Sequence, residues 1–351
     1  MGLVLGGFMS IKKITALLLA GALMFTALTG CGANAEDTIA TLGEENVSFG
    51  VTNFLMKYQK ASVDDMYAMY GMTWDVDLYG TGTTMEEDFK TSAMQLMHDL
   101  YTLKNHMDDY EVEITAEDEA AITEAASAFL AANSKEAIEE MGATQEIVEE
   151  VLTLYTIQAR MYEAIIADTN REVSAEEANM RGYSMVTINL DGEYDESYNY
   201  VEYTDAEVAV LRESADRMSE LLLGKSLEAA AEELGFEVTT GAYAKDDATL
   251  SEELLTVMDN LKEGDVSKMI ETDSALYFVR IDTDTDEVAT EGNRQTIIAE
   301  REAALYEEVL NSWQENDGWT VDEAMVDKID FHNLFTQIEE STEGVENTES
   351  E

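Results

Sequence analysis

The chain has 351 residues, of which 45% are hydrophobic, so it is long enough for two compact domains with cores of their own. Its 20 Lys and Arg stand against 75 Asp and Glu, and the formal net charge of −55 repels nucleic acid and anionic lipid headgroups. This charge excludes a nucleic-acid-binding protein.

The first thirty residues have the pattern of an export signal. Lys12 and Lys13 form a basic segment, residues 14–28 are apolar, and the run Leu28-Thr29-Gly30-Cys31 is similar to the lipobox of bacterial lipoproteins. The apolar run is shorter than the ~20 residues that a membrane span needs. We predict that residues 1–30 are a lipoprotein signal peptide and that Cys31 carries the lipid. Whether translation starts at Met1 or Met9 stays open.

Cys31 is the only cysteine of the chain, so no intrachain disulfide can form although export leads to an oxidising compartment. A lone cysteine at this place is best explained as the lipid attachment point. A free surface thiol after ordinary signal cleavage is the alternative.

Residues 31–172 have the periodicity of helices. Ser48 is placed to cap a helix in which Val51, Phe54 and Tyr58 recur at intervals of three and four residues. The run from Thr115 to Asp118 resembles a capping box and marks another helix start. Further helices are predicted at 85–107, 115–133, 134–141 and 144–167.

Methionine and tyrosine gather at 66–72, shortly before Trp74. Thioether side chains adapt their shape at little cost, so the cluster could form a pliable surface for varied polypeptides. Core filling at helical spacing is the alternative, and both interpretations stay open.

Residues 173–287 mix strand and helix patterns. The run 183–190 puts Val186 and Ile188 on one face, which is the period of a strand, and the apolar run 275–281 is short enough to be a buried strand. The predicted order is β-α-α-β-α-β-β. Between the two runs the pattern gives helices at 205–223, 226–234 and 251–261, then a turn at 262–267 and a third short strand.

The last part of the chain returns to helix. An apolar stripe predicts a long helix over 294–313, and 320–331 forms a closing segment. Residues 339–351 are acidic and lack aromatic side chains, which predicts a disordered tail.

The strand and helix order, with the runs SLEAAAEELGF, LKEGDVSKMIET and ALYFVRI, resembles the parvulin family of peptidyl-prolyl isomerases. The helical flanks resemble the exported foldases of the PrsA and SurA type. This resemblance implies an α+β fold, in which a parvulin-like domain at 173–287 is inserted into a SurA-N-like helical chaperone domain. That domain would consist of 31–172 and of a return helix and closing segment at 288–338.

The parvulin resemblance also locates a site. The family carries histidines in the phrases S-H-I-L and G-Y-H-I-I, and these positions correspond to Met185 and Tyr277. The family's acid or cysteine has only Glu237 as a counterpart. Prolyl isomerisation breaks no covalent bond, so an apolar seat that favours the twisted amide could remove part of the barrier. Met185, Leu250, Leu254 and Tyr277 are the candidates for this peptide-binding seat, and plain core packing is the alternative.

These patterns predict a foldase or chaperone, anchored by lipid to the extracytoplasmic face of the cell membrane, that assists the folding of exported polypeptides. Both histidine positions are replaced, so its isomerase activity is predicted to be weak or absent. An active prolyl isomerase is the first alternative. A solute-binding lipoprotein is the second, disfavoured because the repeated β-α-β pattern of two-lobed binders is missing.

No cofactor or metal is expected. His98 and His106 lie eight residues apart on one predicted helix and cannot share a metal as residues four apart do. The partners implied are unfolded or partly folded exported polypeptides, and a homodimer stays open.

Overall fold

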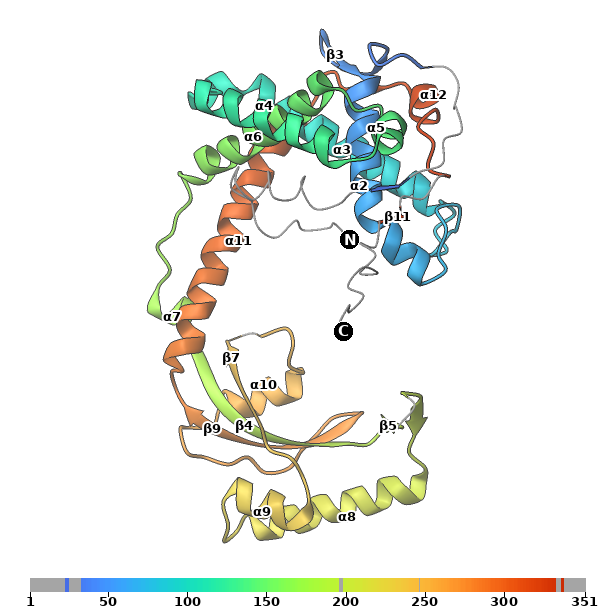
Figure 1. Cartoon of the computed structure of the whole chain (residues 1–351). Coiled ribbons are helices and arrows are strands. Elements are labelled where there is room, and N and C mark those ends of the chain that lie inside the picture. The colour runs from blue at the N-terminus through green and yellow to red at the C-terminus, as the bar shows by residue number, and fades with distance from the viewer. Residues whose placement is uncertain (1–22, 25–32, 196–197, 246, 333–335, 338–351) are drawn as a thin grey trace, which may run out of the picture. The chain divides into compact units, whose positions relative to one another are not determined.

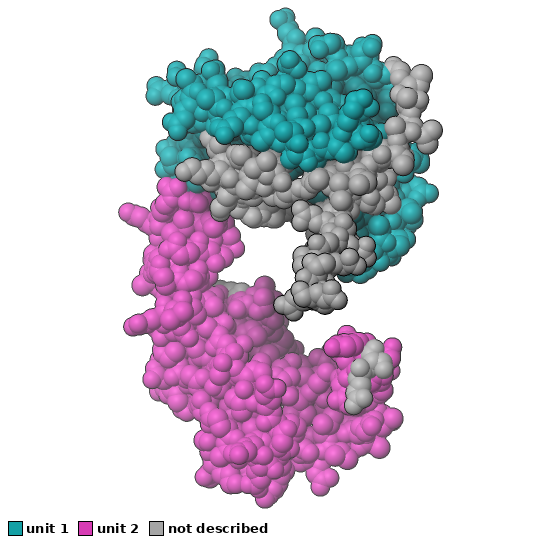
Figure 2. Space-filling model, in the orientation of Figure 1, with its two compact units in different colours: residues 1–169, 303–351 teal, residues 170–302 magenta. Residues whose placement is uncertain are grey.

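The computed structural model describes residues 23–24, 33–195, 198–245, 247–332 and 336–337. It forms two compact units, coloured separately in Figure 2. Unit 1 comprises residues 1–169 and 303–351, and unit 2 comprises residues 170–302. The predicted α+β class is confirmed, since unit 1 is mainly helical and unit 2 contains a four-stranded sheet (Figure 1).

Several predictions fall where nothing is described. Cys31, the predicted acidic tail and nearly all of the predicted signal peptide lie outside the described residues. The predicted domain boundaries at 172/173 and 287/288 stay predictions beside the division into units at 169/170 and 302/303.

Unit 1 is built mainly from helices that follow one another closely. A small antiparallel sheet has the strand order β10-β2-β3, and two further short strands, β1 and β11, pair with each other. The long helix α11 contains residues of both units. The elements are β1 (Leu23–Met24), β2 (Thr38–Leu42), β3 (Glu45–Ser48), α2 (Phe49–Met69), α3 (Met85–Asn105), the 3-10 helix η1 (Met107–Tyr110), α4 (Ala116–Ala132), α5 (Lys135–Met141), α6 (Gln145–Ile166), α11 (Glu287–Gln314), β10 (Thr320–Val321), α12 (Glu323–Val326) and β11 (Thr336–Gln337).

The predicted helix starts are confirmed where a capping residue marks them. The Ser48 hydroxyl accepts a hydrogen bond from the backbone of Val51 at the start of α2. Thr115 and Asp118 form a full capping box at the start of α4. The start of α11 was predicted seven residues too late, because Asp286 caps it: its carboxylate accepts a hydrogen bond from the backbone N–H of Ala289 at 2.9 Å.

The residues after 303 complete the core of unit 1. Leu310, near the end of α11, packs with Met161 and Ile165 of α6 in one apolar cluster. Phe331, which is fully buried, belongs to the main cluster that also contains residues of α2, α3, α4 and α6. Segments far apart in the sequence therefore share one core.

A charged pair lies inside that main core. Lys60 and Asp64 of α2 are both fully buried, and the ammonium Nζ lies 2.6 Å from Oδ2 of Asp64. The indole N–H of Trp74 donates to the other carboxylate oxygen at 2.8 Å. Nζ also lies 5.6 Å from the ring centre of Trp74 and 5.8 Å from that of Phe331, within the range of cation–π attraction.

The methionine and tyrosine cluster at 66–72 divides between surface and core. Met69 and Tyr70 are among the most exposed apolar side chains described, and Met66 is also exposed. Tyr67 instead packs on Trp74, which is buried, with ring centres 4.9 Å apart. Core packing thus accounts for Tyr67, and the pliable-surface interpretation stays a prediction for the exposed Met66, Met69 and Tyr70.

Unit 2 contains an antiparallel sheet of strand order β7-β4-β9-β8. The predicted order of strands and helices is confirmed, with two additions to that order: a short helix before the first strand and a hairpin of β5 and β6. The elements are α7 (Ala175–Ala178), β4 (Met180–Asn189), β5 (Gly192–Tyr194), β6 (Tyr200–Glu202), α8 (Asp205–Leu221), α9 (Leu227–Leu234), β7 (Thr239–Ala244), α10 (Glu252–Met258), β8 (Ile270–Glu271) and β9 (Ala275–Thr283).

The two faces of this sheet belong to different clusters, because successive side chains of a strand point to opposite faces. Val186 and Phe278 pack with residues of α8 and α9. Met185 and Val279 contribute to the opposite face, which packs with Leu254 of α10. Figure 1 shows α10 on one side of the sheet and α8 and α9 on the other. We call the face under α10 the α10 face.

Candidate functional site

The four predicted seat residues come together on the α10 face. Leu254 is buried in its apolar cluster, and Met185, Leu250 and Tyr277 pack against the cluster while half-buried. They come from β4, β9, α10 and the turn before α10. The fold therefore gathers these side chains, and their role as a seat for a prolyl peptide stays a prediction.

The strand register places Met185 and Tyr277 as diagonal neighbours. Met185 lies opposite Val279, and Tyr277 lies opposite Thr187. Diagonal side chains on one face are within reach of each other when they are long. Thr187 is exposed, as is Thr239, which pairs with Met185 from β7. This end of the α10 face is therefore open to solvent.

Arg181 holds α10 against the sheet. Its Nη1 donates to the Tyr243 hydroxyl at 2.9 Å and to the Met258 carbonyl at 2.8 Å. Its Nη2 donates to the Leu261 carbonyl at 2.7 Å and to Oδ1 of Asp284 at 2.7 Å. The carbonyls at a helix end lack partners within the helix, so the guanidinium stabilises the end of α10. Sequence reasoning missed this residue, whose only signal is a cation at the start of a strand.

Two tyrosines extend the polar part of the same face. The ring of Tyr183 lies over Gly241 on β7, where a Cβ atom would come within 2.7 Å of the Tyr183 hydroxyl. Burial raises the pKa of Tyr183, and the carboxylate of Asp247 raises it further. Burial also raises the pKa of Tyr243, against the opposing effect of Arg181. Both hydroxyls therefore stay neutral at physiological pH.

The α10 face offers apolar contact at the seat and, beside it, the two neutral hydroxyls and the Arg181 guanidinium, and the Tyr243 hydroxyl also donates to Oδ1 of Asp259 at 3.3 Å. Residues 170–302 contain neither histidine nor cysteine. Glu237, the counterpart proposed for the family's acid, is exposed and lies outside the apolar cluster of this face. The four seat side chains can hold an apolar side chain of a peptide, and the Tyr277 hydroxyl is the single polar group among them.

The histidines lie in unit 1, and those of α3 and its C-terminal end each contact a carboxylate. His98 lies 2.6 Å from Oδ2 of Asp317, and His106 lies 2.6 Å from Oδ2 of Asp109. In the part of the chain that the structure describes, no group of three His, Cys, Asp or Glu is placed to hold a metal ion.

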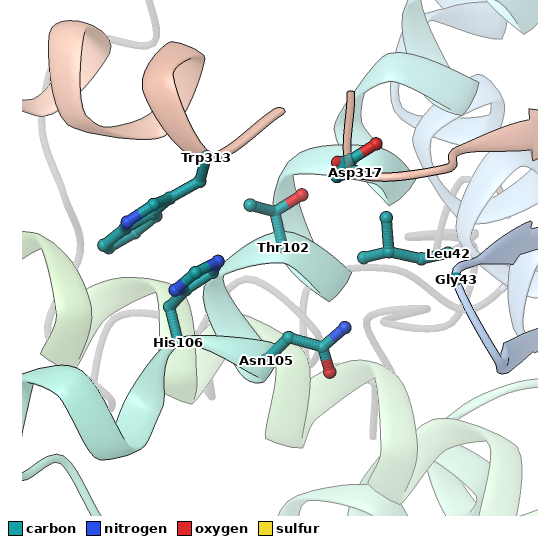
Figure 3. A pocket seen from close by; sticks show the side chains of 7 residues that line it. All are labelled: Leu42, Gly43, Thr102, Asn105, His106, Trp313 and Asp317. Carbon is teal, nitrogen blue, oxygen red and sulfur yellow. The ribbon is translucent and has the colours of Figure 1, made fainter. Parts of the chain in front are cut away.

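A small cavity of about 220 Å³ lies in unit 1 (Figure 3). His106 and Trp313 stack in parallel along it, with ring centres 4.1 Å apart. The buried Thr102 hydroxyl has no hydrogen-bond partner among the described residues. A cavity of this size has room for ordered water, which can supply the partner that the hydroxyl lacks. We assign no catalytic role to this cavity.

A family model matches the larger part of unit 2. Residues 192–291 match the family model of the PPIC-type PPIase domain. This part of unit 2 is similar to the PPIC-type PPIase domain. Leu250, Leu254 and Tyr277 lie inside the matched part of this PPIase domain, whereas Met185 on β4 precedes it. The predicted resemblance to the parvulin family is thereby confirmed for the central domain.

Solved structures of foldases are similar to the chain over most of their length. Foldase protein PrsA from Lactococcus lactis is 15% identical, with 84% of this chain and 97% of that chain covered and a TM-score of 0.33. Peptidylprolyl isomerase PrsA from Bacillus cereus is 14% identical, with 73% and 98% covered and a TM-score of 0.32. These TM-scores are too low to carry an argument, so the assignment rests on the PPIase domain match. No curated protein matches the chain.

Proposed function

We propose that the chain is a foldase that binds unfolded or partly folded exported polypeptides, with a PPIase domain that is weak or inactive as an isomerase. The observation that carries the proposal is the α10 face, which gathers an apolar seat but offers Met185 and Tyr277 at the positions of the family's histidines. Methionine donates no hydrogen bond, and tyrosine offers a single hydroxyl at a longer reach. Such a site binds an apolar side chain and stabilises a twisted amide poorly.

The first test measures isomerase and chaperone activity side by side. We expect the full chain to change the rate of a proline-limited refolding reaction by less than about twofold, against an uncatalysed time of tens to hundreds of seconds. In the same conditions it should suppress aggregation of a denatured client. Exchanging Met185 and Tyr277 for histidine tests whether the absence of the family's histidines limits the rate of prolyl isomerisation. The control is Val210→Ala, at an exposed position on α8.

An active isomerase is the second candidate, because the PPIase domain match favours it. Rapid catalysis by the unaltered chain that is lost in Tyr277→Phe would establish this candidate in place of the first. If the chain neither accelerates refolding nor protects a client from aggregation, both candidate functions are refuted.

The membrane anchor is a further part of the proposal and rests on the sequence around Cys31. We propose that a lipid on Cys31 holds the chain at the extracytoplasmic face of the cell membrane. Across the described ranges, the structure has no helix that is both long and apolar enough to cross a membrane.

Replacing the cysteine tests the anchor directly. We expect Cys31→Ser to move the chain from the membrane fraction to the soluble fraction, or to stop its processing, because no other thiol can take the lipid. Fractionation and the mass of the mature chain measure both effects, with Ser341→Ala as a control. A variant that stays with the membrane at its mature mass refutes the assignment.

A further inference from the structure

An aromatic groove lies in unit 2 between the hairpin β5–β6, the end of β4 and helix α8. Its volume is about 440 Å³, within the range of small-ligand sites. Tyr194, Tyr200 and Tyr203 line it from the hairpin and the residue after it, and Leu211 and Phe236 line it from α8 and the segment after α9. We call this cavity the tyrosine groove.

The hairpin wall of the groove is held in place by close backbone contacts. Gly192 pairs with Glu202, and a Cβ atom on Gly192 would come within 2.2 Å of the Val201 carbonyl oxygen. The Asn189 amide donates to the Gly192 carbonyl at 2.7 Å, which ties the hairpin to the end of β4. The rings of Tyr194 and Tyr200 meet edge to face with centres 5.4 Å apart. The aromatic wall is therefore preformed.

The surroundings of the groove are strongly anionic. Glu193 lines it, and the nearest following cation in the sequence, Arg212, pairs with Glu271 at 2.7 Å, while no lysine or arginine occurs from residue 182 to residue 211. Partial burial raises the pKa of Tyr200, and the carboxylates of Asp191 and Glu202 raise it further. Partial burial also raises the pKa of Tyr203, as does its hydrogen bond to Glu193. Aromatic faces beside carboxylates attract organic cations.

The groove and the candidate seat meet at the end of β4, although Leu211 and Phe236 of the groove pack with the cluster on the opposite face of the sheet. Thr187 lines the groove and lies directly opposite Tyr277 in the strand register. An extended peptide advances about 3.3 Å per residue, so a chain whose apolar residue lies on the seat reaches the groove within a few residues. β7 pairs with β4 only as far as Met185, so a peptide that passes around the free end of β4 can contact both.

We propose that the tyrosine groove binds a Lys or Arg side chain of a client polypeptide, next to the residue on the seat. This inference rests on the proposed function and narrows its substrate class to segments in which basic residues flank an apolar residue or a proline. The charge complements the groove, and the aromatic rings can take the cation by cation–π contact. A phosphorylated segment would be repelled by the same carboxylates.

The test is direct binding of labelled peptides to the full chain, followed by fluorescence anisotropy at physiological salt. Three peptides are identical except at the positions beside their single proline, which hold Arg, Gln or Glu. We expect the Arg peptide to bind about tenfold more tightly than the Gln peptide, and the Glu peptide to bind most weakly. Tyr200→Ala and Glu193→Gln should each remove most of the preference for Arg.

The matched control separates the groove from the general charge of the molecule. Glu213→Gln removes the same charge from an exposed position on α8 that does not line the groove, and it should leave the preference unchanged. Circular dichroism checks that each variant is folded. Equal binding of the three peptides, tighter binding of the Gln peptide, or equal effects of Glu193→Gln and Glu213→Gln would overturn the proposal.

The anisotropy measurement is independent of client protection. Arg-selective binding without suppression of aggregation would refute the proposed chaperone function and leave the groove assignment standing. Suppression of aggregation without Arg-selective binding would refute the groove assignment and leave the proposed chaperone function standing.

Discussion

Replacing Asp64 by Asn lowers the free energy of unfolding by about 3–5 kcal/mol, the range measured when one partner of a buried ion pair is removed. Lys60 and Asp64 have side chains that are 1% and 0% exposed. The substitution keeps the volume and an acceptor for the Trp74 indole but removes the negative charge beside a buried ammonium. Denaturant unfolding followed by circular dichroism measures the loss.

The control for this prediction is an exposed pair with the same spacing. Lys135 and Glu139 are 81% and 61% exposed, and Glu139→Gln should change stability by less than about 0.5 kcal/mol. Adding Lys60→Met to Asp64→Asn should recover much of the loss, because an apolar side chain of similar volume needs no counter-charge. A loss below about 1 kcal/mol in Asp64→Asn would show that the pair is not a major source of stability.

The stability loss caused by Asp64→Asn should depend on pH in a defined direction. Burial lowers the pKa of Lys60 from 10.5, and Asp64 opposes this shift. Removing Asp64 lowers the pKa of Lys60 further in the folded state only. When the pKa of a lysine is lower in the folded state than in the unfolded state, the folded protein is destabilised by the full amount at pH values below both pKa values. This destabilisation fades as the pH rises from the folded-state pKa toward the unfolded-state pKa. The difference between Asp64→Asn and the unaltered chain should therefore shrink with rising pH below about 10.5.

Excising residues 181–286 and joining the ends with a short Gly and Ser linker should leave unit 1 folded. The two ends already meet, because the Asp286 N–H donates to the Met180 carbonyl at 2.7 Å. The two apolar clusters of unit 1 contain no residue from 170–302. We expect a cooperative, helical unfolding transition close to that of unit 1 in the full chain, and retained suppression of aggregation.

A truncation provides the matched control for the excision. Ending the chain after residue 302 removes Leu310 and Phe331, both of which are buried in the clusters of unit 1. That shorter chain should lose cooperative unfolding, since several large core side chains are removed at once. An excised chain that is equally unfolded by circular dichroism would contradict the independence of unit 1.

Local signals made the elements of this protein predictable from its sequence. A capping side chain acts within three residues of itself, so Ser48 and Thr115 marked their helix starts correctly. Alternation at 183–190 fixed which side chains of β4 share a face, because the period of a strand is two. The resemblance to the parvulin family followed from the order of these elements and from short runs of sequence.

Sequence patterns did not predict the features that depend on contacts among several segments of the chain. The hairpin β5–β6 has strands of three residues, too short for a periodic pattern, and it forms because Gly192 admits the backbone of its partner strand. The role of Arg181 depends on where α10 ends against the sheet. Neither can be read from the residues in order.

The sequence by itself determined the charge of the protein, its export pattern, its strand and helix order and the residue types at the two positions that carry histidine in the family. Only the tertiary structure decided which of those residues meet. Met185 and Tyr277 became neighbours through the register of β4 and β9, and Lys60, which reads as a surface residue, became buried because Asp64, Trp74 and Phe331 surround it. Burial and register depend on contacts between distant segments, and composition and periodicity carry no record of them.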